Sequence, residues 1–339
     1  MGLLAGDGRR RRRAVLGGGI VFILSLLAVA GARSFIVLLG AFTVFYPASG
    51  AFVSLTQAEL MDAWPDRQAQ VMARWDLAGS TGAVAGPLLL TAVLAAGGGW
   101  RAAYLVLAAL AAVAWLGTCL CEPHPVRAAA DRDPEPRVAF PARARMVLAA
   151  LRDWSTARWV WLSVVADLLV DVLTGFLALY LVDVAHLRPA IAALAIAIRL
   201  GSGLAGDAAL VFVLDRVTDV TVLRASAAAA ALLYPGFLLA PGPAAKLAVL
   251  AVLSAATAPW YPLLQARMYG SLPGRSSVAV TLSSVAGLAG GLGPLAVGLL
   301  AEAFGLSWAL AVLVVVPVAV LAGSAGAGPA AGPPGSAGE

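Results

Sequence analysis

Two apolar segments of the sequence each carry ionisable side chains along one helical face. Residues 159–182 hold a polar stripe at spacings of four, four and three: Ser163, Asp167, Asp171 and Thr174. Residues 189–214 hold a second one: Arg199, Ser202, Gly203, Gly206 and Asp207. Such spacings place side chains on one side of a helix. Ionisable groups in an apolar helix are costly to bury, and they pair with one another, bind protons or line water-filled paths.

The depth of these groups predicts which of them pair. At 1.5 Å per residue, Asp171 and Arg199 both lie roughly 18–22 Å from the inner ends of their helices, and Asp167 and Asp207 roughly 10–13 Å. We therefore expect Asp171 to be charged and paired with Arg199, and Asp167 to carry a proton. Two interpretations remain open, because these side chains could hold the two helices together or could form the wall of a cavity.

The elements that position these groups follow from composition and from the length of the apolar runs. The chain of 339 residues is 61% hydrophobic and 12% charged, whereas soluble domains average about 45–50% and 25%. A membrane span needs about 20 mostly apolar residues. Ten such runs occur, which predicts an all-α polytopic membrane protein: 14–32, 34–56, 77–96, 102–120, 159–182, 189–214, 222–240, 247–265, 278–301 and 307–323.

The distribution of cations predicts the orientation in the membrane. If each run crosses once from an inner start, eighteen of the 23 lysine and arginine residues face the cytoplasm. Arg33, Arg101, Arg188 and Lys246 then face outward, and Arg199 falls within a span. This bias follows the positive-inside rule and predicts cytoplasmic termini for this chain. The sequence lacks asparagine and has one lysine, which is typical of a GC-rich bacterial genome and favours a bacterial cytoplasmic (inner) membrane.

An internal repeat relates the two parts of the chain. "TQAELMDAWPDR" (56–67) and "LQARMYGSLPGR" (264–275) align at an offset of 208, which also matches Asp7 with Asp215. Internal repeats are common in secondary transporters. Two apolar runs precede Asp215 in the second copy, whereas six residues precede Asp7 in the first. We therefore expect halves of four and six helices, and two alternatives stay open: the first two helices are encoded ahead of this start, or they have been lost.

Short motifs connect this repeat to a known family. Asp7, Gly8 and Arg9 to Arg13 resemble the acidic, arginine-rich loop signature of the major facilitator superfamily (MFS), and a second set echoes it: Asp215, Arg216 and Arg224. A glycine-proline motif of the same family is similar to two further sets here: Gly82, Gly86 and Pro87, and Gly290, Gly293 and Pro294.

The resemblance implies two MFS-like helical bundle halves, at 1–121 and 158–324, joined by a cytoplasmic linker at 122–157 with an amphipathic segment. A disordered tail follows at 325–339. The loop residues imply cytoplasmic gates, for which the candidates are Asp7, Arg9, Arg10, Asp215, Arg216 and Arg224. The glycine-proline sets imply close, sliding helix contacts. Helices that line the family's cavity add four candidates to the substrate and proton site: Tyr46, Trp260, Tyr261 and Gln265.

The sequence lacks the motifs of nucleotide-binding, metal-binding and catalytic sites. "GSGLAG" (201–206) has dinucleotide-binding spacing, but it lies within an apolar run and follows no strand, which favours helix packing. The sequence has no P-loop, zinc spacing or catalytic triad, so we expect no enzyme activity, cofactor, metal site or nucleic-acid partner.

The prediction is a monomeric secondary transporter that moves a small solute by alternating access with proton coupling. The alternatives are an inactive or regulatory truncated fragment and an integral membrane enzyme acting on lipid.

The predicted orientation can be measured with a fusion after Glu339. A reporter that becomes active only in the periplasm should remain silent there, because ten crossings return the chain to the cytoplasm. The same reporter placed after Arg101 should be active. Strong activity after Glu339 would mean that the helix count is wrong by one.

Overall fold

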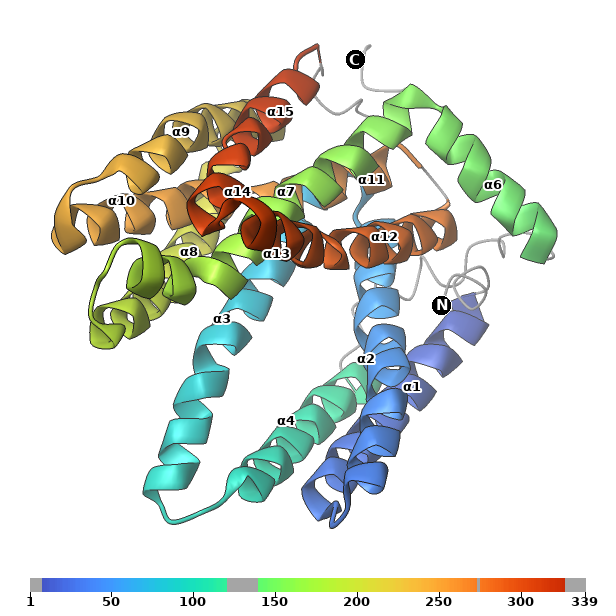
Figure 1. Ribbon diagram of the computed structural model, residues 1–339. Coiled ribbons are helices and arrows are strands. Elements are labelled where there is room, and N and C mark those ends of the chain that lie inside the picture. The colour runs from blue at the N-terminus through green and yellow to red at the C-terminus, as the bar shows by residue number, and fades with distance from the viewer. Residues whose placement is uncertain (1–7, 121–139, 273–274, 327–339) are drawn as a thin grey trace. The chain divides into compact units, whose positions relative to one another are not determined.

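The computed structural model describes residues 8–120, 140–272 and 275–326 (Figure 1). Asp7, most of the linker and nearly all of the tail lie outside these residues. Over the described ranges the chain forms helices and no strands: α1 (Gly8–Gly31), α2 (Phe35–Ala63), η2 (Pro65–Arg67), α3 (Gln68–Ala95), α4 (Trp100–Leu120), α6 (Phe140–Arg152), α7 (Trp154–Leu179), η3 (Tyr180–Val184), α8 (Pro189–Val213), α9 (Asp219–Leu239), α10 (Gly242–Thr257), α11 (Trp260–Gly270), α12 (Ser276–Gly291), α13 (Gly293–Phe304), α14 (Leu306–Val312) and α15 (Val315–Gly323).

Ten segments among the described residues are long and apolar enough to cross a membrane, which confirms the predicted number. The last three are each broken into two helices, and a proline stands near each break: Pro259 before α11, Pro294 in α13 and Pro317 in α15. Proline lacks an N–H and clashes with the preceding turn. Pro47, Pro87 and Pro235 lie inside helices that continue past them.

The chain packs as two compact units, and the first comprises Met1–Pro65, Ala85–Ala149 and Leu272–Thr281. In this unit α1 packs along α2 and α4 (Figure 1). A Cβ atom on Gly19 would overlap Cδ1 of Trp115, so only glycine permits this approach between α1 and α4. The Trp115 indole then reaches the carbonyl of Leu16, to which it donates a hydrogen bond of 2.9 Å.

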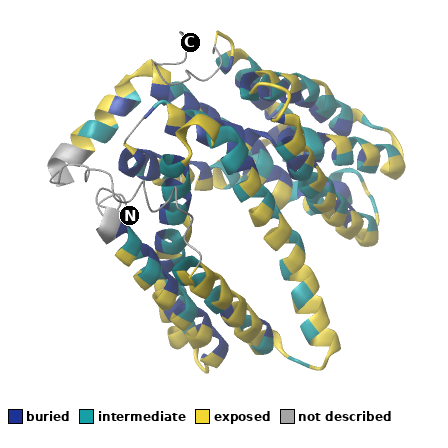
Figure 2. Ribbon diagram, turned by 180° about the vertical axis from the view of Figure 1, so that it is seen from behind, coloured by how far each residue is buried: buried dark blue, intermediate teal, exposed yellow. Residues whose placement is uncertain are grey.

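The second unit comprises Asp66–Val84, Ala150–Ser271 and Leu282–Glu339. Here α8 and α9 pack against α10, and α7 packs against α8, α11, α13 and α15. Gly206 makes a close approach, since a Cβ on it would lie 2.7 Å from the carbonyl oxygen of Ala255 in α10. Many large apolar residues are exposed, as contact with lipid tails requires. Figure 2 shows exposed positions in yellow along the helices.

The predicted glycine-proline contacts differ between the two sets. A Cβ on Gly82 or Gly86 of α3 would meet nothing within 4 Å, whereas one on Gly293 would lie 2.6 Å from Leu168 of α7. Gly293 therefore serves a helix contact in this structure. The role of Gly82, Gly86, Pro87 and Pro294 in sliding contacts stays a prediction.

Two charged side chains fix helix ends in the second unit. Asp153 is the N-cap of α7, and hydrogen bonds from the Ser155 side chain and backbone N–H hold the pKa of Asp153 below its ordinary value. Lys246, expected in an outward loop, instead lies in α10 with 7% of its surface exposed. Its ammonium donates hydrogen bonds of 3.0 Å to Tyr180 Oη and to the carbonyls of Phe237 and Leu238, at the end of α9.

This arrangement uses all three ammonium protons of Lys246 without a carboxylate. The aromatic rings of Tyr180 and Phe237 lie 5.2 and 5.5 Å from the same nitrogen. A cation at the C-terminal end of a helix is also favoured by the helix dipole. Lys246 therefore joins α10 to the ends of α9 and α7.

We predict that Lys246→Met lowers the free energy of unfolding by about 1–3 kcal/mol, because the Phe237 carbonyl loses its donor while the apolar stem is kept. The measurement is the thermal unfolding midpoint of the purified protein in detergent. Arg188→Gln, which removes an exposed cation, is the matched control and should leave the midpoint unchanged. Equal midpoints for Lys246→Met and the native protein would contradict a stabilising role for the Lys246 hydrogen bonds.

Candidate functional site

The polar stripe of α7 meets α8 through Arg199. The guanidinium of Arg199 donates a 2.7 Å hydrogen bond to the carbonyl of Val170 and a 2.6 Å bond to Thr174 Oγ1. Its Nε is buried and finds no hydrogen-bond partner among the described residues. Arg199 therefore bridges the turns on either side of Asp171.

The direct ion pair expected between Asp171 and Arg199 is not formed in the described part of the chain. Asp171 is exposed and lies within electrostatic range of Arg199, yet the short donor distances go to Val170 and Thr174. The guanidinium reaches across to α7, where the Val170 carbonyl and the Thr174 hydroxyl accept its hydrogen bonds in place of the Asp171 carboxylate. The attraction between the two charges remains without a direct contact.

Asp167 is half-buried on the same stripe, one turn before Asp171. Across the described residues its carboxylate makes no hydrogen bond or ion pair. One neighbour is Asp171, a second carboxyl group one turn further along α7. Another is Gly290 of α12, where an added Cβ atom would lie 4.0 Å from the Cβ of Asp167. A carboxyl group in such a place can accept a proton without breaking an existing contact.

Asp207 does not share a site with Asp167, although their depths along the helices are similar. Asp207 is buried, with 4% of its surface exposed, and its Oδ2 accepts a 2.5 Å hydrogen bond from Ser80 of α3. Asp76, one turn before Ser80, lies within electrostatic range of Asp207. Asp76 lies one residue before the apolar run predicted at 77–96, whereas the span in the structure begins at Pro65, so Asp76 falls inside it.

The four aromatic and amide candidates occupy different surroundings. Trp260 is buried, and its indole donates a 3.1 Å hydrogen bond to Ser226 Oγ. Gln265 is also buried and accepts a 3.1 Å bond from Ser283 Oγ. Tyr261 is 38% exposed and Tyr46 is 74% exposed. Trp260 and Gln265 therefore join helices of the second unit, while Tyr46 and Tyr261 present accessible rings.

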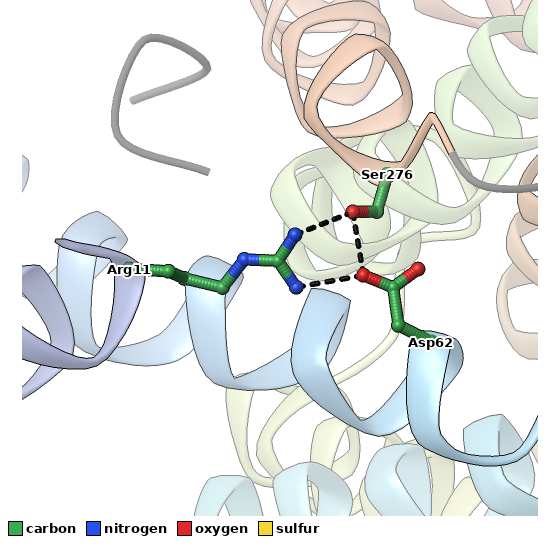
Figure 3. A network of polar contacts seen from close by, with 3 residues as sticks. All are labelled: Arg11, Asp62 and Ser276. Carbon is green, nitrogen blue, oxygen red and sulfur yellow. Dashed lines mark hydrogen bonds and ion pairs between the residues drawn. The ribbon is translucent and has the colours of Figure 1, made fainter. Parts of the chain in front are cut away.

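In the first unit, Arg11 forms a closed polar network with Asp62 and Ser276 (Figure 3). The two guanidinium nitrogens reach Asp62 Oδ2 and Ser276 Oγ, each at 2.7 Å, and Ser276 Oγ donates to the same Asp62 oxygen at 2.7 Å. Arg11 is 9% exposed. The network attaches the first residue of α12 to α1 and to the end of α2.

The second unit has an ion pair in which one residue is repeat-equivalent to Arg11. Arg267 Nε lies 2.6 Å from Asp219 Oδ2, and its Nη2 donates to Asp219 Oδ1 at 2.6 Å. At the repeat offset of 208, Asp219 corresponds to Arg11. At the same offset Arg267 corresponds to Glu59 and Asp62 corresponds to Gly270, so the two ion pairs share one repeat-equivalent position and differ in the other.

These contacts differ from the predicted gating set. Asp215 and Arg216 are exposed, and the pairing charge is Asp219, four residues after Asp215. Arg224 donates to the carbonyl of Ser324 at 2.8 Å, beside the end of α15. Asp7 and the side chains of Arg9 and Arg10 lie outside the described residues, so Arg11 is the described member of that arginine run with a defined network.

A double-mutant cycle tests the Arg11 network. Arg11→Gln and Asp62→Asn should each destabilise the protein, and their combination should cost less than the sum, with a coupling of about 1–3 kcal/mol. Thermal unfolding in detergent provides the measurement. Arg67→Gln, at an exposed arginine, is the control for loss of charge. Additive effects of the two substitutions would contradict the network.

Comparison with known proteins identifies the fold. Residues 1–281 match the Major Facilitator Superfamily. The structure is similar to the E. coli fucose:proton symporter FucP, with a TM-score of 0.74 and 14% identity over 93% of this chain and 83% of that one. The human organic anion transporter MFSD10 (TETRAN) gives a TM-score of 0.72 and 20% identity over 95% and 80% of the two chains.

No curated protein matches the chain significantly in sequence. The ten membrane-spanning segments, the polar side chains within them and the match over residues 1–281 agree with one another. The chain belongs to the Major Facilitator Superfamily.

Proposed function

We propose that this protein is a secondary active transporter that moves a small solute across the cytoplasmic membrane of a bacterium by alternating access, with proton coupling. The transporter fold supports the class of activity. Proton coupling is supported by Asp167, a half-buried carboxylate without a hydrogen bond in the described structure. A similar fold in a protein named as a fucose:proton symporter supports the same proposal.

The arrangement around Asp167 suits reversible proton binding. Protonation removes its repulsion from Asp171 one turn away, and deprotonation restores it. Arg199 keeps a positive charge near Asp171 while it is bonded to α7. A change in the charge of Asp167 therefore acts through Asp171 on Arg199 and so on the α7–α8 contact, which is the kind of coupling that alternating access requires.

The Arg11 network gives the proposal a second element. Arg11 and Asp62 hold the first residue of α12 through Ser276. We propose that this network is a cytoplasmic latch that closes in one state of the cycle and opens in the other. The Asp219–Arg267 pair would serve the corresponding loop of the second copy of the repeat.

The central test is Asp167→Asn in proteoliposomes. L-fucose and a panel of organic anions, chosen from the names of the similar structures, are the first solutes to try, with internal pH followed by a trapped dye. We expect the native protein to move protons with its solute. Asp167→Asn should abolish uphill transport and proton movement while solute exchange continues, because the amide cannot bind the proton.

Asp183→Asn is the matched control, since Asp183 is an exposed carboxylate on η3, and it should transport normally. Uphill transport by Asp167→Asn would contradict the role of Asp167. Lipid turnover without solute flux would instead support a membrane enzyme. If the protein shows no flux of any tested solute and no turnover of any tested lipid, that result would support an inactive or regulatory protein.

A further inference from the structure

A second buried carboxylate site lies between α3 and α8, apart from the α7 stripe. Asp207 is 4% exposed, and Ser80 donates to its Oδ2. Its other oxygen, Oδ1, is fully buried and has no hydrogen-bond partner among the described residues. A buried carboxylate oxygen without a donor is costly, because it has lost its water and gained no replacement.

Asp76 supplies the second carboxylate of this site. Asp76 and Ser80 are four residues apart on α3 and therefore share a helix face. Since Ser80 contacts Asp207, that face is turned toward α8, and Asp76 lies within electrostatic range of Asp207. All three residues belong to the second unit.

The position of Asp207 is fixed by the residue beside it. Gly206 lies directly against the backbone of Ala255 in α10, so α8 cannot rotate at this level without a clash. The carboxylate of Asp207 is consequently held toward α3. The unpartnered oxygen is therefore a built feature of the packing.

The surrounding charges do not neutralise the pair. On α7, which packs against α8, the carboxyl groups are Asp167 and Asp171, and the cation Arg158 lies in the first two turns of the helix. On α8, Arg199 is two turns away and is bonded to Val170 and Thr174. On α10, the ammonium of Lys246 is bonded to Tyr180 and two carbonyls. On α3, Arg74 is exposed, and no ion pair to Asp76 or Asp207 occurs in the described residues.

We propose that Asp76, Ser80 and Asp207 form a proton-binding site in which one proton is held between the two carboxylates. When the proton is bound, a carboxyl O–H replaces the missing donor at the Asp207 Oδ1 and joins α3 to α8. When it leaves, two adjacent anions in a medium of low dielectric repel each other. The use of this proton in transport rests on the proposed function, whereas the binding site itself does not.

Infrared spectroscopy of the full chain in lipid nanodiscs tests the site directly, because a protonated carboxyl has its own C=O stretching band. In the native protein this band should persist above about pH 5, where an ordinary aspartate, with a pKa of about 3.9, is ionised. Both Asp76→Asn and Asp207→Asn should lose this contribution. In each variant the introduced amide can donate to the remaining carboxylate, which then stays ionised.

Asp183→Asn is the control and should leave the band unchanged, since that side chain is exposed. Persistence of the band in both site variants would overturn the proposal. Its loss in only one of them would overturn the shared proton. Loss in Asp167→Asn alone would assign the proton to Asp167, so that this inference fails while the proposed function survives.

Thermal stability gives a second readout that does not depend on the spectrum. If the folded protein holds a proton that the unfolded chain has released, stability must fall as the pH rises through deprotonation of the pair. Asp76→Asn should remove this part of the decline and unfold no earlier than the native protein at alkaline pH. An unchanged decline in Asp76→Asn would count against the site. Absence of solute-driven proton flux with the band intact would overturn coupling but leave the binding site.

Discussion

A hydrocarbon layer contains no water to bond polar groups, so each one must find its partner within the protein. Much of this structure follows from that constraint. The ammonium of Lys246 uses two carbonyls and a tyrosine hydroxyl, and it forms no ion pair within the described residues. Arg199 takes a carbonyl and a threonine hydroxyl of the neighbouring helix. Isolated hydroxyls return to their own helix, as Ser254 does when it donates to the carbonyl of Leu250.

Three exceptions to this rule among the described residues lie at the candidate sites. Asp207 keeps one buried oxygen without a donor, and Arg199 keeps a buried Nε without an acceptor among the described residues. Asp167 is half-buried with no hydrogen bond in the described chain. Groups left in this way are energetically poised, because a proton, a solute or a movement of one helix can supply what is missing. These positions are therefore where transport chemistry fits.

The two loop ion pairs share one repeat-equivalent position, at which the sign of the charge differs. Arg11 pairs with Asp62, and its repeat partner Asp219 pairs with Arg267. The energy of a charge pair depends on separation and surroundings, and exchanging the two signs leaves it unaltered. The second partners are not repeat-equivalent, since Arg267 corresponds to Glu59 and Asp62 to Gly270. The likeness is one of placement, because both pairs join the start of one helix to the end of another.

The sequence by itself determined the helical spans, because crossing a hydrocarbon layer needs about 20 apolar residues and this signal is local. It did not determine the breaks, since helices continue past Pro47, Pro87 and Pro235 although each proline removes a backbone donor. Only the tertiary structure decided which polar groups meet. Asp76 is just outside the predicted run and lies within electrostatic range of Asp207, while Arg199 bonds to Val170 and Thr174 in place of Asp171. The choice of partner depends on the rotation and depth of one helix against another, and these are set by side-chain packing such as that at Gly206, which the spacing along a single helix does not encode.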